Sequence, residues 1–152
     1  MTTAIVKTSK FAAIDSRWTD GLDFTVEAKM RKYIYADGEL YLFSGSEYPI
    51  LLEQALLIGD LTEDDYLRFY EELDPNEVFG SLIIDEHSGY LIQKEGHTYD
   101  WHHGIAYTGS GGTMAKHLKS SMKTSPSPNG ARVSLSEAKA RLARRKARFA
   151  SK

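Results

Sequence analysis

The chain begins Met1-Thr2-Thr3, and a small residue in the second position permits removal of the initiator methionine. Removal would leave Thr2 with a free α-amine and a side-chain hydroxyl on the same residue. Such a residue can be both nucleophile and base, because the amine can accept the hydroxyl proton. A free α-amine has a pKa of about 7.7–8.0, so part of it is neutral near pH 7. An ordinary processed N-terminus is the alternative interpretation.

Three later segments carry residues that could assist such a nucleophile. An apolar run is followed by Asp15-Ser16-Arg17, Lys29 precedes the segment Leu42-Phe43-Ser44-Gly45-Ser46, and an apolar run leads into Gly109-Ser110-Gly111-Gly112. Each segment alone has a plainer interpretation. The first could be a turn pair and Lys29 a solvated strand residue. The last could be a strand–helix turn or an anion site at a helix N-terminus.

In their order and approximate spacing, the four segments together resemble the proteasome β-subunit and HslV-like N-terminal threonine hydrolases, over residues 2–120. The resemblance implies a four-layer αββα sandwich, the Ntn hydrolase fold, with a shortened C-terminal part. It implies a threonine-type endopeptidase that needs no cofactor and no metal. It also implies assembly into rings, an ATP-dependent unfoldase as partner, and peptides or unfolded proteins as substrates.

The resemblance also assigns the catalytic residues, which are Thr2, Asp15, Lys29, Gly45 and Ser110. A positive charge on Lys29 would lower the proton affinity of Thr2, and Asp15 would hold that ammonium group. Gly45 would offer its N–H to the negative tetrahedral intermediate, since glycine lets the backbone approach closely. Ser110 would relay protons near the α-amine, and Arg17 would support its turn.

The chain also departs from the family. The spacing from Thr2 to Asp15 is a few residues shorter, which requires a tighter first hairpin. The family continues with two more strands where this chain has a basic helix, and residues 132–152 lack the aspartate of the late region in β-subunits. We therefore expect a minimal member that acts in the cytoplasm, or in the host cytoplasm if a phage encodes it.

Hydrophobic periodicity predicts an α+β fold with helices packed on sheets. Asp37-Gly38 predicts a tight hairpin turn, because both positions favour positive φ. Thr62 with Asp65 predicts the start of a helix that Pro75 closes. The expected strands are residues 4–6, 11–14, 25–29, 33–35, 40–43, 79–84, 90–93 and 105–107, and the expected helices are 48–58, 62–73, 111–122 and 134–152.

Composition narrows the class of protein. The 152 residues include no cysteine, which excludes disulfides, thiolate catalysis and zinc–thiolate sites. No apolar run approaches 18 residues, so we expect no membrane span.

Residues 1–122 form the expected Ntn-like domain, 123–133 a Pro/Ser/Gly linker, and 134–152 a helix docked on the domain.

The C-terminal segment is basic. Residues 132–152 hold eight Lys and Arg and one acid, whereas residues 1–131 hold eleven bases and twenty acids. Ser134 and Glu137 form a capping box, and Leu135, Ala138, Leu142 and Phe149 form an apolar stripe. The competing hypothesis is an inert scaffold of the same fold whose basic tail binds nucleic acid or an acidic partner.

Four histidines could suggest a metal site. They are His87, His97, His102 and His103, with Asp100 nearby. Adjacent residues on a strand point to opposite faces, and no pair has the i, i+4 spacing of a helical zinc site. We therefore interpret them as surface loop residues.

Overall fold

The computed structural model describes residues 4–16, 18–19, 25–26, 30–89, 91–96, 98–101, 105–108 and 133–150. It has mixed α and β structure, as the sequence predicts. The strands are β1 (Ala4–Lys7), β2 (Phe11–Ile14), β3 (Trp18–Thr19), β4 (Thr25–Val26), β5 (Tyr33–Ala36), β6 (Glu39–Gly45), β7 (Phe79–Asp85), β8 (Leu91–Gly96), β9 (Thr98–Trp101) and β10 (Ile105–Thr108). The helices are α1 (Glu47–Leu57), α2 (Glu63–Glu71) and α4 (Leu135–Ala150).

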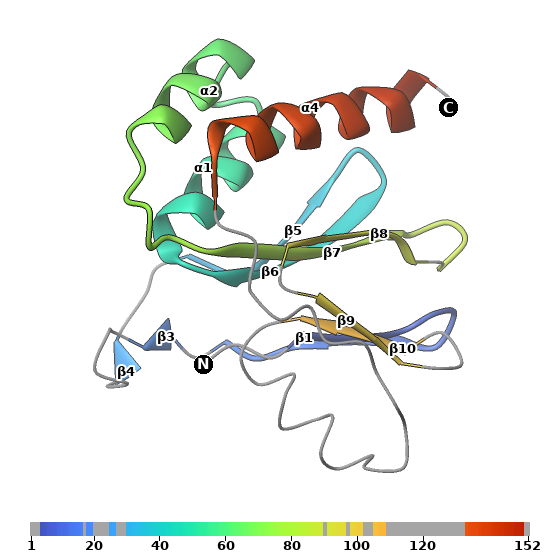
Figure 1. Ribbon diagram of the computed structural model, residues 1–152. Helices are drawn as coiled ribbons and strands as arrows, with labels where there is room; N and C mark the ends of the chain where they lie inside the picture. The colour runs from blue at the N-terminus through green and yellow to red at the C-terminus, as the bar shows by residue number, and fades with distance from the viewer. Residues whose placement is uncertain are drawn as a thin grey trace.

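The strands form two four-stranded antiparallel sheets. One has the order β2-β1-β10-β9, the other has the order β5-β6-β7-β8, and β3 pairs with β4. Figure 1 shows α1, α2 and α4 on one face of the β5–β8 sheet and the other sheet against its opposite face. The described part of the chain thus forms three layers, helices on sheet on sheet. The helix expected at residues 111–122 lies outside it.

Alternation along β6 divides the apolar residues between two cores. Tyr41 and Phe43 belong to the core between the β5–β8 sheet and the helices. Leu42 packs on the other face, with Ala4 and Ala106 of the facing sheet. The β5–β8 sheet is therefore covered on both faces, which explains why β6 and β7 are buried along almost their whole length.

Local signals in the sequence act as predicted. Asp37 and Gly38 have φ angles of 54° and 77° at the β5–β6 turn. The Asp65 N–H donates to the Thr62 hydroxyl over 3.1 Å, which caps α2. The Glu137 N–H donates to the Ser134 hydroxyl over 3.2 Å at the start of α4.

Helix α4 packs on the molecule largely through polar groups. Ala138 and Leu142 of its apolar stripe are buried, whereas Leu135 and Phe149 are half-buried, so the apolar contact is narrower than the sequence suggests. Between the two buried residues lies Arg141, which is 6% exposed.

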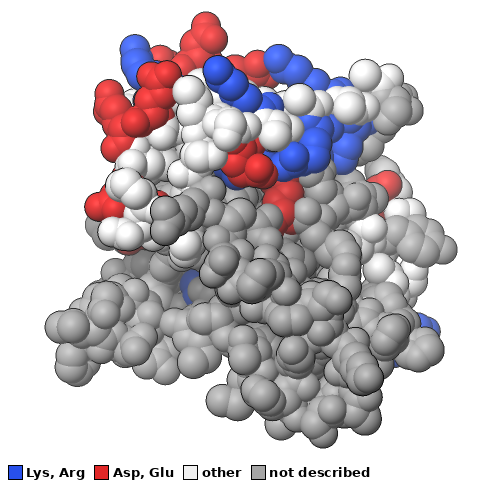
Figure 2. All heavy atoms as spheres, viewed as in Figure 1, with Lys and Arg blue, Asp and Glu red and all other residues white. Residues whose placement is uncertain are grey.

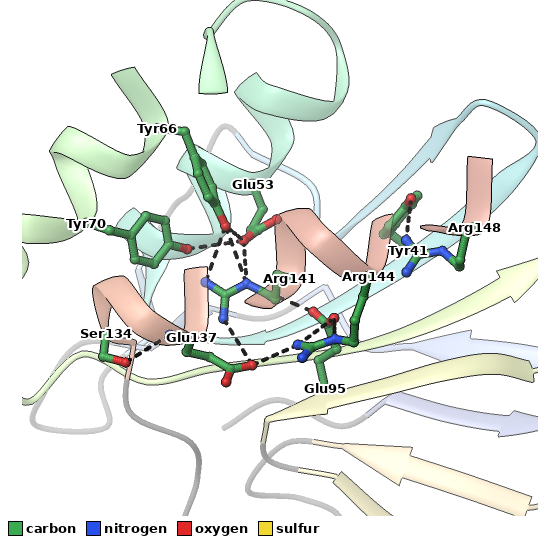
Figure 3. Close-up of polar contacts among 10 residues, drawn as sticks. All are labelled: Tyr41, Glu53, Tyr66, Tyr70, Glu95, Ser134, Glu137, Arg141, Arg144 and Arg148. Atoms are coloured by element: carbon green, nitrogen blue, oxygen red, sulfur yellow. Dashed lines mark hydrogen bonds and ion pairs between the residues drawn. The ribbon is translucent and has the colours of Figure 1, made fainter. Parts of the chain in front are cut away.

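A buried polar network surrounds Arg141 (Figure 3). Its Nε atom donates to Glu53 Oε1 over 2.9 Å, and the hydroxyls of Tyr66 and Tyr70 donate to the same oxygen. The guanidinium of Arg144 bridges Glu95 and Glu137, at 3.0 and 2.8 Å. Burying these charges is tolerated because nearly every one faces an opposite charge.

Of the helices that the structure describes, none combines the length and apolar character needed to cross a bilayer.

Candidate functional site

The ends of three strands meet in the β2-β1-β10-β9 sheet. Ala4, the first residue of β1, pairs with Ile14 on one side and with Thr108 on the other. Asp15 follows Ile14 directly, and Gly109-Ser110 follows Thr108 in the sequence. Strand β1 thus begins between the end of β2 and the end of β10.

The second sheet brings two further residues to the same place. Strand β6 ends at Gly45, and the Phe43 N–H donates to the Lys32 carbonyl over 2.8 Å. Lys32 therefore lies beside the last residues of β6, just before β5 begins. We call this meeting of strand ends from both sheets the sheet-end site.

An ion pair joins the two sheets at the sheet-end site. Lys32 Nζ lies 3.3 Å from Oδ1 and 3.5 Å from Oδ2 of Asp15. The Lys32 side chain is 1% exposed and that of Asp15 is 35% exposed. Burial lowers the pKa of the Lys32 ammonium, and the charge of Asp15 and its hydrogen bond oppose that shift. The site thus holds a buried lysine side chain that its ion pair with Asp15 keeps in place.

Trp18 forms a wall beside that charge. The Lys32 Nζ atom lies 5.0 Å from the centre of the indole ring, a cation–π contact. The indole N–H donates to the Met30 carbonyl over 3.1 Å, which holds the segment that leads to Lys32. Trp18 was not among the predicted site residues, since its type and position carry no chemical signal without the fold.

The sequence assigned the lysine role to Lys29, which lies outside the described residues, as do Thr2, Arg17 and Ser110. The ammonium that the structure places against Asp15 is that of Lys32. Lys29 and Lys32 belong to one basic cluster, so sequence alone does not separate them. Of the predicted catalytic residues, the structure describes Asp15 and Gly45 and brings both to the sheet-end site.

Gly45 occupies a position that requires glycine. Its φ is +117°, and an added Cβ would lie 2.3 Å from the Val78 carbonyl oxygen. The next residue, Ser46, donates its N–H to that oxygen over 2.9 Å and accepts a hydrogen bond from the Val78 N–H over 3.1 Å. The backbone between β6 and α1 is therefore fixed against β7, as an oxyanion donor must be.

An open groove of about 780 Å³ lies between β5 and α1, next to the residues that precede Lys32. Apolar side chains of Met30, Ile34 and Leu51 line it, and Arg31 and Glu47 add opposite charges. A groove of this mixed character suits an extended chain with varied side chains.

The histidine cluster falls largely outside the described residues, which include His87 but not His97, His102 or His103. The part of the chain that the structure describes contains no group of three or more His, Cys, Asp or Glu placed to hold a metal ion.

Comparison with known proteins adds no assignment. No protein-family model matches the chain. No curated protein matches it either.

Proposed function

We propose that the chain is a threonine-type endopeptidase whose nucleophile is Thr2 after removal of Met1. The observation that carries the proposal is the ion pair between buried Lys32 and half-exposed Asp15, beside the start of β1. Consecutive Cα atoms are 3.8 Å apart, so chain connectivity alone keeps the Cα of Thr2 within about 7.6 Å of that of Ala4. An N-terminal hydroxyl and amine then come close to a buried cation.

In this proposal Lys32 takes the role that the sequence pattern gave to Lys29. A positive charge near Thr2 favours the alkoxide and the neutral amine, because both lose a proton relative to their resting forms. Asp15 fixes the charge through a charge-assisted hydrogen bond, and Trp18 restricts its access to water. No cofactor is required.

The Gly45 N–H is the proposed donor to the tetrahedral intermediate. Hydrogen bonds of Ser46 to Val78 hold this backbone in place before substrate arrives, and preorganised donors are the most effective ones. Ser110 is the proposed proton relay near the amine, on the grounds that Thr108, two residues earlier, pairs with Ala4.

The proposed substrates are peptides and unfolded proteins, bound in the groove between β5 and α1. The proposal includes the four-layer Ntn fold, a ring assembly that encloses the sites, and an ATP-dependent unfoldase that feeds them in the cytoplasm. Closed rings use large, repeated contacts between identical subunits. Exposed Tyr48 and Ile58, on and just after α1, are available for such contacts.

The alternative, an inert scaffold with a nucleic-acid-binding tail, has less support. Five cations of α4 already face acids of the body, as Figure 2 shows in part by the mixing of basic and acidic atoms over the helices. These ion pairs are Arg141–Glu53, Arg144–Glu95, Arg145–Asp37, Lys146–Glu63 and Arg148–Glu39. Phosphate binding would have to compete with them.

Intact mass spectrometry after treatment with a threonine-directed epoxyketone tests the proposal. The expected result is loss of Met1 and one adduct per chain, located on Thr2. A Thr2→Ala variant, checked for folding by circular dichroism, should form no adduct and cleave no unfolded casein. Adduct formation or cleavage that persists in folded Thr2→Ala would rule out the N-terminal nucleophile, and a wild-type chain that keeps Met1 would do the same.

A further inference from the structure

A second polar contact joins the two sheets at the sheet-end site. The hydroxyls of Ser44 and Thr108 lie 2.9 Å apart and hydrogen-bond to each other across the interface between the sheets. Ser44 is 1% exposed and Thr108 is 0% exposed. Leu42 and Ala106, two residues before them on the same strands, belong to the apolar core between the sheets.

Two hydroxyls contribute little stability in an apolar layer. A buried hydrogen bond roughly repays the loss of hydration of its two partners, and an apolar pair of similar shape would stabilise the interface about as well. Apolar contact is non-directional and lets two sheets slide over each other, whereas a hydrogen bond fixes distance and direction. The Ser44–Thr108 pair is therefore better suited to set the relative position of the sheets.

The residues that follow show what that position controls. Ser44 directly precedes Gly45, the proposed oxyanion donor, and Thr108 directly precedes Gly109-Ser110, the proposed proton relay. Ser44 belongs to β6 of one sheet and Thr108 belongs to β10 of the other. Among the described strands, β6 and β10 are not paired with each other, so the separation of Ser44 from Thr108 depends on contacts between the two sheets.

We propose that the Ser44–Thr108 hydrogen bond is a positioning contact that fixes the Gly45 N–H relative to the end of β10, which the Gly109-Ser110 segment follows in the sequence. The proposal rests on the threonine-peptidase function proposed above. Ser44 and Thr108 are positioning residues, since each acts through the residue that follows it. The Asp15–Lys32 pair fixes the cation at the same boundary, so two independent contacts align the sheets around one reaction centre.

Four variants separate positioning from stability. Ser44→Ala/Thr108→Val removes both hydroxyls, and Ser44→Ala removes only one of them. Thr108→Ser keeps the hydrogen bond with a smaller side chain. The matched control is Ser81→Ala, because Ser81 is 1% exposed on β7 and lines the helix side of the same sheet. Melting temperature, the rate of epoxyketone adduct formation, and kcat and KM for an unfolded substrate are measured for each.

The double variant should melt close to the wild type, because both members of the hydrogen-bonded pair are replaced together by apolar groups. Its adduct rate and kcat should nevertheless fall by about tenfold to a hundredfold with KM little changed, since small displacements of reacting groups have effects of this size. Thr108→Ser and Ser81→Ala should react close to the wild-type rate. A double variant that both melts and reacts like the wild type overturns the proposal, as do rates that merely follow melting temperature.

Hydrogen–deuterium exchange tests the same contact without catalysis. In the double variant, peptides covering residues 43–46 and 105–108 should exchange faster than in Ser81→Ala. Unchanged exchange in both peptides contradicts the proposed contact. If the wild-type chain forms no adduct at all, the proposed function fails on that result alone, and the exchange measurement still decides whether the Ser44–Thr108 pair fixes the two segments.

Discussion

Lys32 Nζ lies 3.3 Å from Asp15 Oδ1, and the two residues flank strands of different sheets. The pair therefore links the sheets and places a cation at the boundary where the chain enters β1. Removing one member of a buried ion pair costs more than the pair contributes, because the remaining charge is left unpaired. Replacing Lys32 leaves Asp15, which is half-exposed and can be rehydrated. Replacing Asp15 leaves the Lys32 ammonium buried without that carboxylate.

Replacing the two candidate lysines should have unequal effects. Lys32→Ala should slow epoxyketone adduct formation at Thr2 on the order of 100-fold, the usual loss when a preorganised electrostatic group is removed. Lys29→Ala is the matched control and should react close to the wild-type rate. Asp15→Asn should fall between them, since the ammonium stays but loses its anchor. The reverse order, with Lys29→Ala slow and Lys32→Ala fast, would restore Lys29 to the role.

The pH dependence of Thr2 reactivity should report on Lys32. The rate should rise as the α-amine becomes neutral, below its ordinary pKa of about 7.7–8.0, because the charge of Lys32 favours the neutral amine. It should fall again when Lys32 loses its proton, and because burial lowers the pKa of Lys32, this second limb should lie below pH 10.5. Adduct rates measured from pH 6 to pH 11 give the profile. A rate that stays at its plateau beyond pH 10.5 would contradict the role of Lys32.

Sequence patterns predicted much of the fold, because they report local chemistry. The Asp37-Gly38 turn, the Thr62 cap and the Ser134 cap each depend on a few neighbouring residues. The short strands β3 and β9 escaped prediction. They are two and four residues long, and they are defined by strand pairing that no local pattern encodes.

The candidate site was harder to predict for the same reason. Gly45 could be identified from its residue type, because glycine adopts backbone angles that other residues avoid, and its φ is +117°. The partner of Asp15 could not be identified, since Lys29 and Lys32 are the same residue type within one basic cluster. The Ser44–Thr108 hydrogen bond spans 64 residues of sequence and connects two ordinary strand positions. A contact of this kind depends on how the two sheets pack, which no local sequence pattern encodes.

Gly45→Ala should damage both stability and reactivity. The added Cβ would meet the Val78 carbonyl at 2.3 Å, which is backbone and cannot swing away. Gly59→Ala is the control, because Gly59 has φ +86° but no heavy atom within 4 Å of the added Cβ. We expect about 1–2 kcal/mol of destabilisation at Gly59 from the backbone angle alone, and clearly more at Gly45. Equal urea midpoints for the two variants would contradict the steric argument.

Glu95 should give the free energy of unfolding a characteristic pH dependence. Burial and the charge of Glu53 raise its pKa above 4.5, against the opposing effects of Arg141 and Arg144. Between pH 4.5 and that raised value the folded state binds more protons than the unfolded state, so this residue makes stability fall as pH rises. Glu95→Gln should remove that fall, whereas Glu71→Gln, on the exposed side of α2, should keep it. Urea titrations from pH 4.5 to pH 8 decide, and identical slopes for both variants would contradict the prediction.

Deleting residues 132–152 should unfold or strongly destabilise the protein. The deletion removes buried Leu142, whose burial contributes about 1.5–3 kcal/mol, and it removes Arg141 from buried Glu53. Loss of one partner from a buried ion pair costs about 3–5 kcal/mol. The point variant Arg141→Met tests the second effect with the chain intact, and Lys139→Ala, an exposed cation of the same helix, is its control. If the truncated protein melts at the wild-type temperature, α4 contributes nothing to the fold and its ion pairs with the body are incidental.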